Sequence, residues 1–215
     1  MTNDLSKLEE QACNPLLVDA ACLNKDAVIP YGCTVSHICA AMNDFIDFLG
    51  FINKQLHSRS MPRLESFLMP ANFSSLVGEF MAMTIPKYSP GLIKNKYHNG
   101  HPDLIPLGVF ADDAVLHAKD GIEVKASRHL SGWQGHNPEE VWLLVFAFDA
   151  NSSRDELQGG LPKPFRFSQV LGAQLTKDDW KFSGRSETSR RTITASVTRS
   201  GYEKMKANWI YRAPA

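Results

Sequence analysis

The chain has 215 residues, of which 43% are hydrophobic and 21% charged, and its formal net charge is zero at pH 7. This length suits one domain with a substantial buried core, and the composition excludes a largely disordered chain. No apolar run reaches the roughly 18 residues that a membrane span needs, and the first ten residues are polar and acidic. We therefore expect no membrane segment and no signal peptide, and we expect a cytoplasmic protein.

The first long helix is predicted from Val35 to about Leu56, because apolar residues recur there every three or four positions. Thr34 or Ser36 is suited to cap its N-terminus. A one-sided apolar stripe fits either a dimerisation helix or a helix packed on its own domain. The second interpretation is favoured, since such a stripe is the normal signal of a core helix.

A second helix is predicted from about Asn72 to Thr84, ending before Pro86 because proline disfavours a helical conformation in the residue before it. Glu79 lies on this helix at the border between the apolar inner face and solvent. It could reach a site beside the helix or stay in water.

Three short strands are predicted next, over Leu104–Phe110, Ala114–Ala118 and Gly121–Ser127, after a hairpin signal at Asn99-Gly100. In the last strand, alternation directs the apolar side chains to one face and those of Glu123 and Lys125 to the other. These two charged residues would lie side by side, about 7 Å apart along the strand.

Asp103, Glu123 and Lys125 suggest metal-assisted cleavage of a phosphodiester bond. Mg²⁺ takes oxygen ligands and is usually held by one or two carboxylates, while an ammonium group beside it can share the charge of a phosphate. Asp112 and Asp113 are alternatives to Asp103 as the first carboxylate, and Asp103 is preferred because Pro102 precedes it.

The sequence Pro102-Asp103, followed by a spacer and Glu123-Val124-Lys125, resembles the signature of the PD-(D/E)xK nuclease superfamily, which includes many restriction endonucleases. The resemblance implies an α/β (α+β) fold with a restriction-endonuclease-like core, a central mixed β-sheet flanked by helices. It implies Mg²⁺ bound by Asp103, Glu123 and the Val124 position, with Glu79 reaching the site from the preceding helix. The alternative is an ordinary charge pair on a solvated strand.

The segment Ser127–Glu140 is polar and precedes an apolar run, Val141–Phe148, that predicts a strand buried on both faces at the centre of the sheet. Nuclease families of this type usually place a helix between these strands, but the glycines and proline of the segment disfavour a full helix here. Gln134, His136 and Asn137 could contact DNA or support Lys125, or form an ordered surface turn.

Residues 151–215 carry 12 basic and 6 acidic side chains, a net charge of +6, whereas residues 1–150 carry 11 and 17, a net charge of −6. Contact with a polyanion is therefore expected in the C-terminal third, where Arg185, Arg190 and Arg191 are candidates for DNA binding. Thr192–Thr198 alternates like a strand, and a solvated β-ribbon is the alternative interpretation.

These features predict an N-terminal helical region (1–60) packed on the core, a nuclease core (61–150) and a basic C-terminal region (151–215) in the same globular unit. The predicted function is a Mg²⁺-dependent, sequence-specific endonuclease of double-stranded DNA, similar to type II restriction enzymes. A repair or recombination nuclease, or a non-catalytic DNA-binding protein with the same fold, are the alternatives. A homodimer is expected, since most duplex targets have two-fold symmetry.

Overall fold

In a computed structural model, which describes residues 2–135, 138–183 and 194–214, a six-stranded mixed sheet lies between helices. The sheet has the order β1-β2-β3-β5-β6-β9; only β3 and β5 are parallel, and the other neighbours are antiparallel. Its strands are β1 (Leu92–Lys94), β2 (Leu104–Pro106), β3 (Ile122–Ser127), β5 (Trp142–Asp149), β6 (Arg166–Gln174) and β9 (Trp209–Arg212). The predicted central mixed sheet flanked by helices is confirmed.

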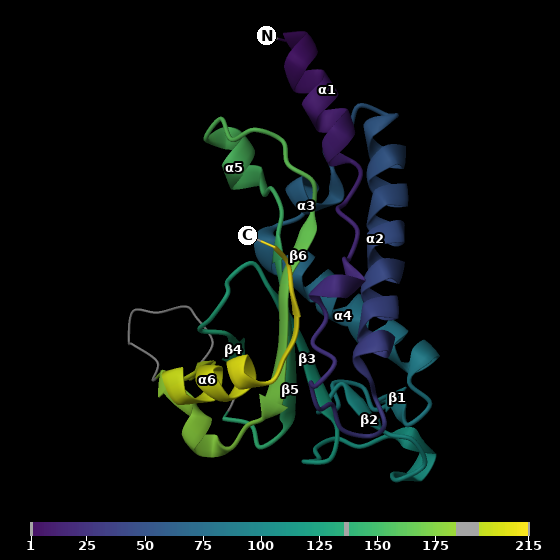
Figure 1. The fold of residues 1–215 in the computed structure, drawn as a ribbon, viewed down its shortest axis with the longest axis vertical. Coiled ribbons are helices and arrows are strands. Elements are labelled where there is room, and N and C mark those ends of the chain that lie inside the picture. Colours follow the sequence, from purple (N-terminus) through teal and green to yellow (C-terminus); the bar gives the residue numbers. More distant parts are fainter. Residues whose placement is uncertain (1, 136–137, 184–193, 215) are drawn as a thin grey trace.

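Helices cover both faces of this sheet (Figure 1). On one side lie α2 and α4, and on the other lie α6 and a small sheet of order β4-β8-β7. The helices are α1 (Thr2–Ala12), α2 (Val35–His57), α3 (Leu64–Phe67), α4 (Pro70–Tyr88), α5 (Ser153–Leu157) and α6 (Arg199–Ala207). The small sheet consists of β4 (Gln134–Gly135), β7 (Trp180–Ser183) and β8 (Thr194–Val197). Single 3₁₀ turns span Ala20–Cys22, Ala111–Asp113 and Lys177–Asp179.

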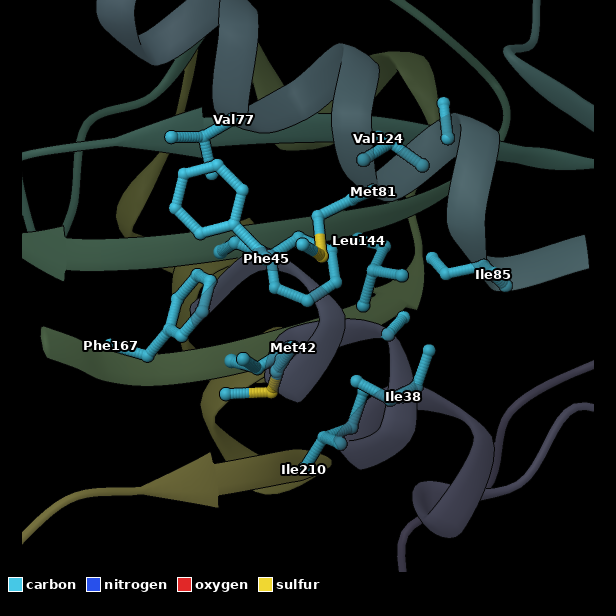
Figure 2. Packing of buried hydrophobic residues seen from close by; sticks show 14 of the residues in the cluster. Ile38, Met42, Phe45, Val77, Met81, Ile85, Val124, Leu144, Phe167 and Ile210 are labelled. Atoms are coloured by element: carbon cyan, nitrogen blue, oxygen red, sulfur yellow. The ribbon is translucent and has the colours of Figure 1, made fainter. Parts of the chain in front are cut away.

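Helix α2 confirms the predicted core helix. Thr34 caps it: its side chain accepts a hydrogen bond from the His37 N–H, while its own N–H donates to His37 Nδ1. The apolar stripe, including Ile38, Met42 and Phe45, is buried against the sheet (Figure 2). By length and composition α2 would also suffice to cross a membrane, but its stripe belongs to the core of the folded chain.

Helix α4 is longer than predicted, beginning at Pro70 and continuing through Pro86. Pro70 stands at the first helical position, where an N–H is not needed. Pro86 lies in the last turn, where its missing N–H costs a single hydrogen bond, and the fully buried Ile85 holds that turn against the core. The expected end before Pro86 was therefore wrong, because packing outweighed the local proline effect.

Strand β5 is buried on both faces, as the run Val141–Phe148 predicts. Leu144 faces α2 and α4, in a cluster that also includes Val77 and Ile210 (Figure 2). Leu143 faces the other way, in a cluster with residues of β7, β8 and α6. The first of these two clusters combines side chains from residues 1–60, 61–150 and 151–215.

Two strand predictions were wrong. The strand expected over Leu104–Phe110 stops at Pro106, which has no N–H to continue the ladder, and Gly108 turns the chain with a φ of +73°. Ala114–Ala118 forms no strand; its one pairing is an isolated bridge between His117 and His101. Between β3 and β5 the described residues form β4 and no helix, as the glycine and proline content of that segment predicts.

Candidate active site

Glu123 and Lys125 lie side by side on β3, on the face that points away from α2 and α4. The intervening Val124 buries its side chain in the core between the sheet and those helices. The Lys125 ammonium donates to Glu123 Oε1 over 2.7 Å. Strand alternation therefore places the acidic and the basic group of the Glu-x-Lys sequence next to each other.

Asp103 reaches the same place from the start of β2. Strand β2 pairs with β3 only at Leu104 and Ile122, so the Val124 N–H lies beyond this pairing and donates instead to Asp103 Oδ2, over 2.9 Å. Gly121 permits this close approach, because a β-carbon there would collide with the Leu104 carbonyl oxygen and the Pro102 ring. The structure thus brings the carboxylates of Asp103 and Glu123 together.

His101 and Glu139 also belong to this cluster, although no motif in the sequence predicts that position for either. His101 Nδ1 lies 2.9 Å from Glu123 Oε2, and His101 Nε2 lies 4.0 Å from Glu139 Oε2. Glu139 precedes β5, which runs parallel to β3 with Trp142 opposite Ile122, so the starts of both strands share one edge. An acidic residue just before β5 therefore falls beside Glu123, and it is the strand order that reveals this.

Glu79, Asp112 and Asp113 were also considered as metal ligands. Glu79 lies at the margin of the charged cluster, and Asp112 and Asp113 lie outside it. Glu79 is exposed on α4 and accepts a hydrogen bond from Lys94 over 2.7 Å. Asp113 instead binds Lys96 and the Gly108 N–H. Neither Asp112 nor Asp113 lines the cleft described next, whereas Asp103 does. The geometry therefore favours Asp103 over its two alternatives.

Of the candidate DNA-contacting residues, the structure describes only Gln134. It lies exposed on β4, opposite Ser196 of β8 in the small sheet. His136, Asn137, Arg185, Arg190 and Arg191 lie outside the described residues.

The charged cluster opens into a cleft of about 1100 Å³ that is formed around the β1–β2 connection and the starts of β3 and β5. Among the described residues that line it, carboxylates and lysines nearly balance: Glu79, Asp103, Glu123, Glu139 and Glu140 face Lys94, Lys96, Lys119 and Lys177. A large cleft with convergent charged groups is the usual form of a binding or active site.

Burial and the charge of Glu123 raise the pKa of the Asp103 carboxyl to about 7, although the Val124 N–H opposes the shift. Burial would also raise the pKa of Glu123, but hydrogen bonds and charges from His101 and Lys125 lower it to about 2. Two adjacent carboxyl groups with pKa values held so far apart are typical of acid-base and metal sites.

The pKa values of the two basic groups are raised for the complementary reason. Burial would lower the pKa of Lys125, but the charges of Glu123, Glu139 and Asp103 outweigh it and raise that pKa. Burial likewise opposes the charge of His101, whose pKa is raised by Glu123 and Glu139. Lys125 is therefore an ammonium ion at neutral pH.

The carboxylate oxygens at this site are suitable ligands for a hard divalent cation. Burial, together with the charge of Glu123, raises the pKa of Asp103, and a cation between the two carboxyl groups would relieve their repulsion. Comparisons of the chain with family models, with curated proteins and with solved structures found no match, so what this site does is inferred from its chemistry.

Proposed function

We propose that the chain is a Mg²⁺-dependent endonuclease that hydrolyses phosphodiester bonds in double-stranded DNA at specific sequences, with a site like that of the PD-(D/E)xK nucleases. The observation that supports it is the meeting of Asp103, Glu123 and Lys125 in one cluster whose two carboxylates line the cleft, although Glu123 comes 20 positions after Asp103 in the sequence. This combination supplies metal ligands and a fixed positive charge together.

In this proposal, Asp103 and Glu123 hold the cation, which would lower the pKa of a water molecule and withdraw charge from the phosphate. Lys125 supports the reaction with its ammonium, which Glu123 orients over 2.7 Å. Because that ammonium is already in place before the substrate arrives, it can stabilise the charge that develops on the phosphate without reorganisation.

The charge of the cleft makes substrate binding depend on the cation. Carboxylates and lysines nearly balance along the described lining, so the cleft alone offers little net attraction to a polyanion. A bound dication would make the lining positive. DNA affinity should therefore increase when Mg²⁺ or Ca²⁺ is added.

The proposed assembly follows from the same function. A homodimer in the cytoplasm would place two such clefts on a two-fold symmetric target, and the basic residues Arg185, Arg190 and Arg191 would add phosphate or base contacts.

The test is incubation with mixed-sequence duplex DNA and Mg²⁺, followed by sequencing of the fragment ends. Cleavage should stop with EDTA, and Asp103→Asn and Glu123→Gln should abolish it; Asp112→Asn, which changes a carboxylate outside the cleft lining, is the matched control. Fragment ends that share one sequence support a restriction-type enzyme. DNA binding without cleavage by the wild-type protein would instead indicate a non-catalytic DNA-binding protein.

A further inference from the structure

His101 is oriented as metal-binding histidines commonly are. Its Nδ1 lies 2.9 Å from Glu123 Oε2, so the imidazole donates its Nδ1 proton to a carboxylate and directs Nε2 away from it. A histidine that binds a metal usually donates its other ring N–H to a carboxylate or carbonyl in this way, which fixes the tautomer and the ring plane.

The atom that Nε2 approaches is a carboxylate oxygen. Glu139 Oε2 lies 4.0 Å from His101 Nε2. Two ligand atoms that each lie about 2.1 Å from one ion can be at most about 4.2 Å apart, so this spacing admits a shared cation. Ligand atoms of His101, Glu123 and Glu139 all lie within 4.8 Å of one another.

We propose that His101 Nε2 and Glu139 form a second cation site, oriented by Glu123 and separate from the Asp103 position, and that it takes a first-row transition-metal dication such as Mn²⁺ in preference to Mg²⁺. Imidazole nitrogen suits these ions, whereas Mg²⁺ prefers an all-oxygen shell and gives up its water reluctantly. The cleft beside these residues leaves room for water to complete the coordination shell. The site does not require that the chain cleaves DNA.

The test is a titration of the whole protein with Mn²⁺ in excess Mg²⁺ and without nucleic acid, followed by electron paramagnetic resonance. The wild-type protein should bind Mn²⁺ and show spin coupling to an imidazole ¹⁴N nucleus. His101→Ala should remove that coupling and weaken Mn²⁺ binding by about tenfold or more, and Glu139→Gln should weaken it comparably. If His101→Ala is unfolded at the temperature of the titration, His101→Asn replaces it as the test variant.

Matched controls come from the same cleft. His117→Ala removes an exposed imidazole and Glu140→Gln removes the neighbouring carboxylate, and neither should change Mn²⁺ binding. Absence of ¹⁴N coupling in the wild type, or unchanged Mn²⁺ affinity in both His101→Ala and Glu139→Gln, would overturn the second site. Because no DNA is present, such a failure leaves the proposed nuclease activity unaffected, and loss of cleavage activity leaves the Mn²⁺ result unaffected.

Discussion

Lys125 stands among three carboxylates that raise its pKa, so its positive charge persists wherever the protein is folded near neutral pH. Replacing Lys125 separates its effect on the cleavage rate from any effect on DNA or metal binding. Lys125→Ala should keep DNA and metal binding nearly intact, while single-turnover cleavage at saturating Mg²⁺ falls by about 10²- to 10³-fold, or about 3–4 kcal/mol.

The control for that variant is Lys119→Ala, which removes an exposed lysine from the lining of the cleft beside the cluster and breaks its ion pair with Glu140. Its cleavage rate should stay within a few-fold of wild type. A Lys125→Ala rate equally close to wild type would remove Lys125 from the mechanism, and with it the main argument that β3 carries an active site.

Asp103 should make metal binding depend on pH, because its carboxyl has a pKa of about 7 and Mg²⁺ must displace the proton. We expect Mg²⁺ affinity to fall about tenfold for each pH unit below 7 and to level off above it. Calorimetric titration across this range measures it, and Asp103→Asn should remove the slope. A pH-independent wild-type affinity would contradict the assignment.

The same pKa has a consequence for stability. A carboxyl whose pKa is raised in the folded state binds its proton more tightly there than in the unfolded chain. Without metal, the contribution of Asp103 to stability is therefore favourable below its unfolded pKa and is lost as the pH rises toward 7. Mg²⁺ should restore stability in the upper part of this range.

At the scale of elements, the connection between β1 and β2 positions the site, and Asn95 holds that connection in shape. Its buried side chain donates to the carbonyls of Pro102 and Val115 and accepts from the N–H groups of Tyr97 and Val115. The Asn95 backbone N–H donates to the Asp103 carbonyl over 2.8 Å. One amide side chain thus links the segment that carries His101 and Asp103 to Val115.

Asn95→Ala should lower the free energy of unfolding by about 1–3 kcal/mol, because it leaves buried backbone groups without partners. It should also weaken Mg²⁺ binding, since the Pro102 carbonyl next to Asp103 loses its hydrogen bond. Thermal melting and metal titration measure the two effects, with His98→Ala, an exposed residue of the same connection, as the control. A destabilised variant with unchanged Mg²⁺ affinity would show that Asn95 does not position the site.

The elements that sequence could predict are those whose pattern repeats over many residues. The stripe of α2, the two-faced burial of β5 and the alternation of Glu123 and Lys125 on β3 each follow from a helical or strand period. Ala114–Ala118 has too short a pattern for such a period, and a proline and a positive-φ glycine shortened β2. The roles of His101 and Glu139 depend on which strands are neighbours, which no local pattern contains.

At the scale of the whole molecule, Arg63 joins parts of the chain that are distant in sequence. Its buried guanidinium donates to Glu9 of α1, Glu65 of α3, Asn151 after β5 and the Lys163 carbonyl. These segments lie at the end of the molecule opposite β1 and β2 (Figure 1). A substitution at that end should therefore lower the stability of the protein without changing the chemistry of the cleft.

Arg63→Met should lower the free energy of unfolding by about 3–5 kcal/mol, since Glu65 would remain buried without its charged partner. Denaturant unfolding measures this loss. Lys87→Met, which breaks the exposed pair with Asp44, should cost less than about 1 kcal/mol. Below its melting temperature, the Arg63 variant should bind Mg²⁺ with wild-type affinity, because no atom of this network lines the cleft. A loss of metal affinity while the protein is still folded would show that the two ends are coupled through the sheet.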